Sequence, residues 1–492
     1  MTVAAPVSAD AVVIGAGVAG SVVAARLAEA GRAVVVVEAG PGVPRPAALW
    51  DSEPVAAADV DDRTRQGLVI RDRADGPARR YRQGFGIGGG SAINGGVLAP
   101  GDAADFEAWA LALGPEHGSS WGPAAMAPWL SAATEQHDPV TFPAGAVTAA
   151  FAAAATEVGH RSGGQSTEAD RAGLLSAGLP LQPGRRVCAV ERFLIPAATT
   201  GLVGLVVGSP VERVLVADDV DGRVGGVVLA DGSTVAAPTV VLCAGSLASP
   251  GLLRRSGLAS EGGGGNRVGS YLVDHPSIAL TLRLRSESAD ADRPRRVSHL
   301  LRWSPPDEPN GPWANGGDLQ AFVVDRVDDG RPDSEPLAAV VVTLVAPTSV
   351  GHLDPDGRVI TGALATERDR RLLRSGLDHL RLVCTREPLA SLVDDVLIDD
   401  RGTPASALDG MDDGAVDRWM LANPGPVAHP LGTCALGSVV SADPADGGRL
   451  VGRSGIHVID GSVLPGPVRA GLQLPITAVA DRLGRALAGA DG

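Results

Sequence analysis

The sequence predicts an α/β fold in which a domain on a parallel β-sheet is interrupted by a second domain on an antiparallel β-sheet. Two observations carry this prediction. Residues 12–38 read as strand, glycine-rich turn, helix and strand, the unit that builds parallel sheets. From about residue 277 the pattern changes to β-like segments separated by charged, proline-rich loops. The first domain is therefore predicted to comprise residues 1–276 and 423–492, and the second 277–422.

The N-terminal unit has the spacing of a dinucleotide-binding motif. Apolar, β-branched runs at 12–14 and 34–37 flank a helical stretch at 21–30. Glu38 ends the second run and is placed to accept hydrogen bonds from a ribose. The unit predicts a Rossmann-type domain that binds an adenine dinucleotide, and it does not separate NAD from FAD.

Three glycines in the turn have separate physical reasons. Gly15 allows the tight turn after the strand. Gly17 lets backbone N–H groups approach a pyrophosphate at the helix N-terminus, where the helix dipole favours anions. Gly20 lets the helix pack closely on the strand.

Two more segments are predicted to bring backbone close to the same ligand. Residues 84–96 contain so many glycines that close approach to a flat or anionic group is indicated. The buried strand 239–242 runs into a turn of small residues, with Ala244 and Gly245, and then into a short helix at 251–256.

The remaining predicted elements complete the two domains. Residues 41–80 are interpreted as a long connection and a candidate flap over the ligand. This segment and 100–190 are assigned partly to a lid or to a substrate-facing role. Helices are predicted at 105–135 (interrupted), 143–160 and 476–487, and a last strand and turn at 455–462. The second domain is predicted from β-like segments at 278–284, 319–324 and 338–345 and an amphipathic helix at 369–384.

Composition excludes several classes of protein. The formal net charge is −15 and the sequence has no lysine, which argues against nucleic acid or an anionic membrane as a partner. The four cysteines form no C-x-x-C pair, so we expect reduced thiols and no metal site. No apolar run reaches about 18 residues, so no integral membrane span is predicted. We expect a cytoplasmic protein and leave peripheral membrane association open.

Four separated stretches together resemble the glucose–methanol–choline (GMC) oxidoreductase family. They are 15–38, 84–95, 244–253 with Asp274-His275-Pro276, and 429–437 with 458–475. The resemblance implies a Rossmann-type FAD-binding domain, an inserted substrate domain on an antiparallel sheet, and oxidation of an alcohol to a carbonyl compound. It places the ADP half of FAD against Gly15, Gly17, Gly20 and Glu38, and the pyrophosphate and flavin against Gly88, Gly89, Ser91, Asn94 and Gly95.

The resemblance assigns a few more cofactor positions. Val211 matches the position whose backbone meets the adenine, and Asp460 and Gly461 match the flavin-contacting turn. Some family members attach the flavin through a histidine in the 88–95 loop. This chain has Ile93 there, so non-covalent FAD is predicted.

His429 is the predicted catalytic base. His429-Pro430-Leu431-Gly432-Thr433-Cys434 matches the family's catalytic histidine motif. Alcohol oxidation needs a base for the hydroxyl proton while hydride leaves to flavin N5, and an imidazole titrates near working pH. His275 is predicted to pack or to anchor its loop, and the other histidines are interpreted as structural.

The second catalytic position departs from the family pattern. Related enzymes place a His or Asn where this chain has Gly471 or Gln473. Glutamine can donate and accept hydrogen bonds but cannot act as a base. The hypothesis is that His429 is the sole base and that Gln473 orients the alkoxide.

Several readings of the function stay open from the sequence alone. Length and composition are similar to the GMC branch associated with mycofactocin, in which the alcohol would be mycofactocinol and electrons would go to a quinone or respiratory component; O2 is the other acceptor considered. A lyase resembling the hydroxynitrile lyases and a non-catalytic flavin-binding partner protein are the alternatives.

Overall fold

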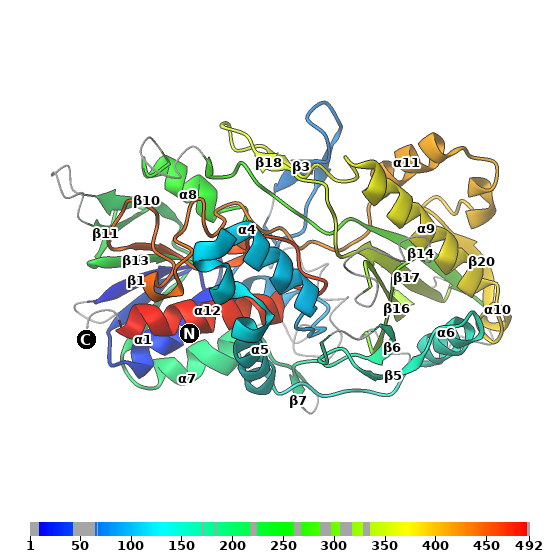
Figure 1. The fold of residues 1–492 in the computed structure, drawn as a ribbon, viewed down its shortest axis with the longest axis horizontal. Helices are drawn as coiled ribbons and strands as arrows, with labels where there is room; N and C mark the ends of the chain where they lie inside the picture. The colour runs from blue at the N-terminus through cyan, green and yellow to red at the C-terminus, as the bar shows by residue number, and fades with distance from the viewer. Residues whose placement is uncertain are drawn as a thin grey trace.

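The computed structural model describes residues 9–42, 64–65, 67–169, 172–182, 185–216, 224–259, 267–285, 297–305, 317–327 and 335–489. Two sheet-based halves lie side by side (Figure 1). Each half has its own hydrophobic core, one around the parallel sheet and one around the large antiparallel sheet. This division agrees with the predicted fold class, while the residue limits given above for the two domains stay a prediction.

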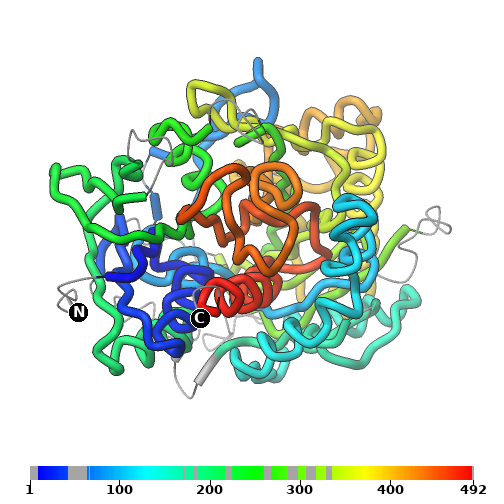
Figure 2. The backbone as a smooth tube through the Cα atoms, turned by 60° about the vertical axis from the view of Figure 1, so that its left-hand side comes forward, coloured from blue at the N-terminus to red at the C-terminus, as the bar shows by residue number. Residues whose placement is uncertain are grey.

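A five-stranded parallel sheet forms the centre of the dinucleotide domain. Its order is β21 (Ile456–Val458), β13 (Thr239–Leu242), β1 (Ala11–Ile14), β2 (Val34–Val37) and β9 (Val203–Val206). All neighbouring pairs are parallel, with Ala11 in register with Val34 on one side and Thr239 on the other. Helices α1 (Val18–Glu29) and α12 (Gln473–Gly489) pack against each other, so the first and the last described helix lie side by side (Figure 2).

The carboxyl ends of these strands bring four predicted cofactor positions to one edge of the sheet. Gly15 follows β1, Glu38 follows β2, Ala244 lies just after β13, and Asp460 lies just after β21. In open parallel sheets, ligands bind outside the carboxyl ends of the strands, at the point where the strand order reverses. Distant sequence segments therefore converge on one candidate site.

The second half is a seven-stranded sheet in the order β20-β14-β17-β16-β15-β6-β5. Its strands are β5 (Ser162–Gln165), β6 (Gly173–Ser176), β14 (Ser277–Leu284), β15 (His299–Trp303), β16 (Leu319–Val327), β17 (Leu337–Leu344) and β20 (Val393–Leu397). All pairs are antiparallel except β5 with β6. Helices α6 (Ala146–Glu157) and α9 (Glu367–Cys384) pack on this sheet.

The sequence pattern missed some of these strands. β15 lies between proline-rich, charged segments and was not predicted. β5 and β6 come from 162–176, inside the 100–190 range assigned partly to a substrate-facing role. The interpretation of 41–80 as a connection did not include two strands, β3 (Val69–Arg71) and β4 (Ala78–Arg80), which pair as a hairpin. Residues 43–63 lie outside the described residues.

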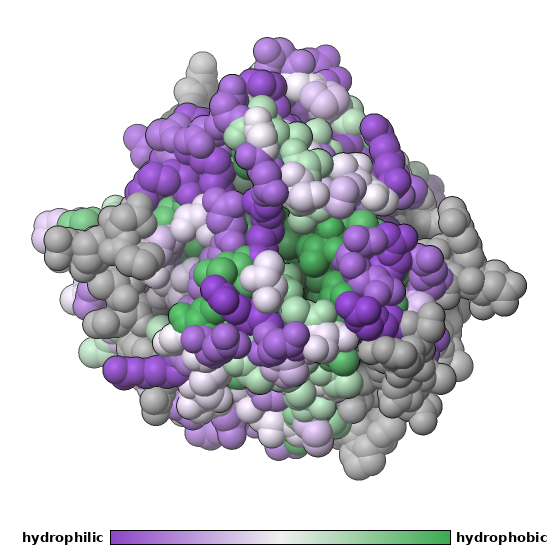
Figure 3. Space-filling view, turned by 90° about the vertical axis from the view of Figure 1, so that its right-hand side faces the viewer, coloured by the Kyte–Doolittle hydropathy of each residue, from purple (hydrophilic) through white to green (hydrophobic). Residues whose placement is uncertain are grey.

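Smaller elements complete the structure. β3 also pairs with β19 (Val359–Ile360), which pairs with β18 (His352–Leu353). Further strands are β7 (Leu181–Gln182), β8 (Arg185–Arg186), β10 (Val211–Val216), β11 (Val224–Leu229) and β12 (Thr234–Ala236). The other α-helices are α4 (Ala103–Trp121), α5 (Pro123–His137), α7 (Ile195–Ala198), α8 (Ser249–Arg255), α10 (Leu389–Leu392) and α11 (Asp413–Ala422). Viewed from the substrate-sheet end, hydrophobic side chains gather around a central hollow that hydrophilic side chains border (Figure 3).

Candidate active site

The glycine turn after β1 has the geometry that an anion site needs. Gly15 has φ +104°, and a Cβ there would lie 2.5 Å from the carbonyl oxygen of Cys243. A Cβ on Gly20 would lie 1.9 Å from the carbonyl oxygen of Gly15, so both positions require glycine. Gly17 begins α1 with no side-chain cap, and the first turn holds no acidic residue. The N–H groups at this uncapped helix start therefore fit a pyrophosphate.

Glu38 is held beside that turn. Its side chain is 8% exposed, and its two carboxylate oxygens accept hydrogen bonds of 2.8 Å from the backbone N–H groups of Ala16 and Gly40. The backbone N–H of Ser209 donates to the carbonyl oxygen of Glu38 at 3.0 Å, which brings the start of β10, and with it Val211, to the acid. Predicted ribose and adenine positions are thus neighbours.

The predicted glycine loop runs directly along the turn. The N–H of Gly88 donates to the carbonyl oxygen of Ala16 at 2.8 Å, and a Cβ on Gly89 would lie 3.1 Å from Cα of Gly17. The buried Ser91 hydroxyl donates to the Gly88 carbonyl oxygen at 2.7 Å, so its side chain holds the loop together. A Cβ on Gly95 would meet no atom within 4 Å, which leaves that side of the loop open.

Asp460 ties the C-terminal turn to the segment after β13. One carboxylate oxygen accepts from the N–H of Gly245 at 2.8 Å and from the hydroxyl of Ser249 at 2.6 Å, and the other accepts from the N–H of Ser462 at 2.8 Å. A Cβ on Gly461 would lie 3.0 Å from the Ser246 hydroxyl oxygen. The uncapped helix, the open glycine loop and the buried Glu38 together fit the pyrophosphate, flavin and ribose of FAD.

The loop that carries His429 is fixed on both sides. The N–H of His429 donates to Asp274 Oδ1 at 2.7 Å, and Leu431 pairs with Val273 through two backbone hydrogen bonds. Gly432 has φ +89°, and a Cβ there would lie 2.4 Å from the ring of Tyr271. The glycine of the histidine motif is therefore required by the close approach of that ring.

His275 lies against the predicted base. The Nδ1 atoms of His275 and His429 are 3.1 Å apart, and the two rings are perpendicular with centroids 5.2 Å apart. Asp274 Oδ1 also accepts the N–H of His275 at 2.9 Å, and its Oδ2 accepts the Tyr81 hydroxyl at 2.5 Å. The sequence interpretation treated His275 as a packing residue. The adjacent Asp274-His275-Pro276 motif was the signal that could have drawn attention to it.

Burial sets the charge state of this cluster. Removal from water lowers the pKa of His429 to about 4, and the pKa of His275 lies well below its usual value because of burial first and then electrostatic interaction with His429 and Arg469. Burial raises the pKa of Asp274 to about 6. At neutral pH both imidazoles are therefore uncharged and Asp274 is ionised, so His429 is available as a base.

Gly471 and Gln473 occupy different places relative to His429. A Cβ on Gly471 would lie 3.9 Å from both Cε1 and Nε2 of His429, so this position faces the imidazole and presents no side chain to it. Gln473 is instead joined to the glycine loop, because its Oε1 accepts a 2.8 Å hydrogen bond from Asn94 Nδ2.

The amide of Gln473 has a defined orientation. The backbone N–H of Gly96 donates to Asn94 Oδ1 at 3.1 Å, which leaves Asn94 Nδ2 to donate to Gln473. Gln473 Nε2 is then a donor, and it is buried with no hydrogen-bond partner among the described residues. An unsatisfied buried donor is costly, so an acceptor on the cofactor or the substrate fits here.

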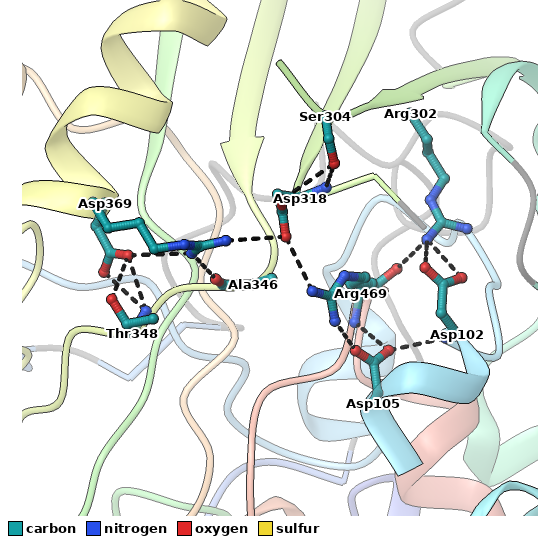
Figure 4. A network of polar contacts seen from close by, with 10 residues as sticks. Asp102, Asp105, Arg302, Ser304, Asp318, Ala346, Thr348, Asp369 and Arg469 are labelled. Carbon is teal, nitrogen blue, oxygen red and sulfur yellow. Dashed lines mark hydrogen bonds and ion pairs between the residues drawn. The ribbon is translucent and has the colours of Figure 1, made fainter. Parts of the chain in front are cut away.

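A buried ion network links Arg469, which lies just before Gly471, to the substrate domain (Figure 4). Arg469 pairs with Asp105 of α4 and with Asp318 of the residues before β16, the latter at 3.0 Å, and all three side chains are at most 3% exposed. Arg302 of β15 donates to the carbonyl oxygen of Arg469 at 3.2 Å and pairs with Asp102 at 2.8 Å. Burial raises the pKa of Asp102 to about 6. The network therefore anchors the residues just before Gly471.

Two kinds of site have no candidate in the part of the chain that the structure describes. No group of three or more His, Cys, Asp or Glu side chains is arranged to hold a metal ion. None of the described helices combines the length and the apolar composition needed to cross a bilayer.

Comparison with known proteins places this geometry in a family. The N-terminal GMC oxidoreductase domain matches residues 9–277 and the C-terminal one matches 347–480. The chain is 30% identical to pyridoxine 4-oxidase of Microbacterium luteolum over 94% of this chain and 97% of that protein. It is 32% identical to an oxygen-dependent choline dehydrogenase of Rhizobium etli over 60% of this chain and 56% of that protein.

Solved structures share the fold. Pyridoxine 4-oxidase from Mesorbium loti has a TM-score of 0.78 at 24% identity, covering 97% of this chain and 99% of that one. A formate oxidase has a TM-score of 0.81 at 20% identity over 99% of both chains. The predicted fold class and enzyme class, an FAD-dependent oxidoreductase, are confirmed, and this chain belongs to the GMC oxidoreductase family.

Proposed function

We propose that this protein oxidises an alcohol to a carbonyl compound, with His429 as the base. The observation that carries the proposal is a neutral imidazole whose Nε2 faces a position without a side chain, Gly471, in a loop fixed by Asp274. Bound FAD would supply the two-electron acceptor for the hydride that leaves the carbinol carbon. His429 takes the hydroxyl proton, and Gln473 Nε2 offers a hydrogen bond to an acceptor in the site.

The substrate is proposed to be a bulky alcohol. A glycine at the position facing His429 leaves room where a larger side chain would exclude substrate. Similarity to pyridoxine 4-oxidase supports an aromatic hydroxymethyl compound of the pyridoxine type. Mycofactocinol is the second candidate alcohol, with a quinone, a respiratory component or O2 as electron acceptor.

Anaerobic mixing of the purified holoprotein with a panel of alcohols tests this function. The panel contains pyridoxine, mycofactocinol, choline and a benzyl alcohol, and the flavin absorbance near 450 nm is followed. Bleaching by an alcohol supports the proposal, and reoxidation with O2 or a quinone then identifies the acceptor. Carbonyl addition or cleavage without bleaching would favour a lyase of the hydroxynitrile type. No reaction with any alcohol would favour a non-catalytic flavin-binding protein.

The pH dependence of alcohol oxidation should reflect the lowered pKa of His429. Only the neutral imidazole accepts a proton, so we expect kcat/KM to stay level down to about pH 5 and to fall as the pH drops through about 4. Asp274 has a pKa of about 6 and contacts His429 only through the backbone. The D274N variant should therefore keep the acid limb near 4. An acid limb near 6.5 in both proteins would contradict this assignment.

FAD is expected to be bound without a covalent link. Ile93 has no nucleophilic atom. It follows the short helix at Gly89–Ala92, in the loop where some family members attach the flavin. Precipitation with trichloroacetic acid should release all of the flavin into the supernatant. A yellow protein pellet would show a covalent bond at another residue.

A further inference from the structure

The large antiparallel sheet has two faces with different surroundings. Alternate residues of β14, β15, β16 and β17 pack in one core with helices α6 and α9, among them Leu280, Ala321 and Val340. Successive side chains of a strand point to opposite faces of the sheet. The residues between the core positions therefore point away from those two helices, and we call their side of the sheet the inner face.

Four polar residues cross the inner face in register. In cross-strand order they are Arg302 of β15, Gln320 of β16, Thr343 of β17 and Ser277 of β14. Both ends of this polar row are joined to the candidate active site. Arg302 donates to the carbonyl oxygen of Arg469, two residues before Gly471. Ser277 comes two residues after His275, which lies against the predicted base.

Phe322 lies next to the polar row, two residues after Gln320 on the same face of β16. Its ring is only partly buried and packs on the same small core as Val97, the residue that follows the glycine loop. The carbonyl oxygen of Val97 lies 3.5 Å from where a Cβ on Gly471 would be, and that point lies 3.9 Å from Nε2 of His429. The inner face of β16 therefore lies opposite the base, across a position that has no side chain.

The amide of Gln320 has no hydrogen bond to any residue that the structure describes. Its Oε1 is buried, whereas its Nε2 is not among the buried atoms, so one end of the amide stays accessible at the inner face. The neighbouring Thr343 hydroxyl is also buried without a partner among these residues. Buried polar groups are normally paired, so this row has hydrogen-bonding capacity to spare. Because no bond fixes the amide, its accessible end can present either the NH2 group or the carbonyl oxygen.

We propose that Phe322 and Gln320 are specificity-determining residues that select an aromatic alcohol carrying a polar substituent on its ring. This proposal rests on the proposed function and narrows its substrate class. The ring of the alcohol packs on Phe322 while its hydroxymethyl group lies at His429. A ring hydroxyl or a ring nitrogen then makes the hydrogen bond that the Gln320 amide lacks. An alcohol without such a group leaves the amide unpaired and reacts more slowly.

The Q320L variant tests the polar contact. Benzyl alcohol and the three hydroxybenzyl alcohols are compared by anaerobic stopped-flow, as the rate constant of flavin reduction divided by the apparent Kd. We expect the unmodified protein to prefer one hydroxybenzyl isomer, and Q320L to lose about tenfold or more of that preference while keeping its rate with benzyl alcohol. The electronic effect of the ring hydroxyl is the same in both proteins. An unchanged preference, or loss of FAD from Q320L, would overturn the proposal.

The F322L variant tests the ring contact. Leucine keeps an apolar side chain but has no aromatic face, so we expect a fall of about three- to tenfold with benzyl alcohol and none with cyclohexylmethanol. T281V is the control, because Thr281 lies on the inner face of β14, four residues along the strand from the polar row, and it should change neither value. Equal falls with both alcohols in F322L would show that the ring is not recognised by Phe322.

A binding measurement needs no turnover. Benzamide and the three hydroxybenzamides are titrated into the oxidised holoprotein, and Kd is taken from the change in flavin absorbance. We expect one hydroxybenzamide to bind about tenfold more tightly than benzamide, and Q320L to abolish the difference. If this holds while no alcohol reduces the flavin, the proposed function fails and the recognition by Gln320 stands. Reduction by alcohols with the same preference in Q320L rejects only the recognition.

Discussion

Replacing His429 with alanine is expected to reduce the rate of flavin reduction by alcohol about 10²- to 10⁴-fold. The reason is that general base catalysis by one positioned side chain contributes on this order. No other neutral base faces the position at Gly471 among the residues that the structure describes. The measurement is stopped-flow anaerobic reduction, with FAD content determined from the absorbance ratio of flavin to protein.

The FAD content of this variant should stay near that of the unmodified protein, because the turn at Gly15 and the acid Glu38 are untouched. H137A is the matched control, since it truncates a buried histidine on α5 whose ring bonds Thr477 and not His429. A His429→Ala variant that keeps more than about half of the rate would assign the base elsewhere and remove the main support for the proposed function.

Replacing Arg469 with methionine is expected to lower the free energy of unfolding by about 3–5 kcal/mol. The change leaves the carboxylates of Asp105 and Asp318 buried without the guanidinium between them. Urea unfolding followed by circular dichroism measures the loss. Turnover should fall more than FAD content does, because the segment that Arg469 anchors continues directly to Gly471 and Gln473.

R485M provides the control for this prediction. Arg485 also pairs with an aspartate, the buried Asp481, but the Arg485 side chain is 49% exposed, and Asp481 keeps Arg26 as a partner when Arg485 is replaced. An ion pair made by a solvent-exposed arginine contributes only about 0–1 kcal/mol, so this variant should unfold almost like the unmodified protein. Adding Asp105→Leu and Asp318→Leu to R469M should recover part of the lost stability, because apolar replacement of a whole buried ion cluster is often neutral. Equal losses for R469M and R485M would show that Arg469 contributes no more to stability than an arginine whose side chain is half exposed.

Local patterns predicted the dinucleotide end of this protein well. The glycine turn, α1, β1 and β2 lie within residues 11–38, so the sequence order is also the spatial order. Gly20 shows why the motif is readable: any side chain would collide with the carbonyl oxygen of Gly15, five residues earlier. The strands β14, β16 and β17 were also predictable, because eight or nine residues of apolar, β-branched character leave few alternatives.

Other elements had too little local signal. β15 has five residues, and it is a strand because β16 and β6 pair with its two edges. The β3–β4 hairpin is charged at half of its strand positions and is stabilised by pairing with β19, almost three hundred residues later. Tertiary pairing therefore decided both, against a weak or contrary local pattern.

The sequence by itself determined the family, the dinucleotide-binding unit at 11–38 and the histidine that opens the motif at 429–434. These features depend on short-range backbone geometry. Only the tertiary structure decided which residues surround His429. His275 lies 154 positions earlier, and the pairing of Val273 with Leu431 together with the Asp274 carboxylate brings the two imidazoles together. Folding likewise decided that Gly471 faces the base while the Gln473 side chain bonds Asn94, because both depend on contacts with segments that are distant in the sequence.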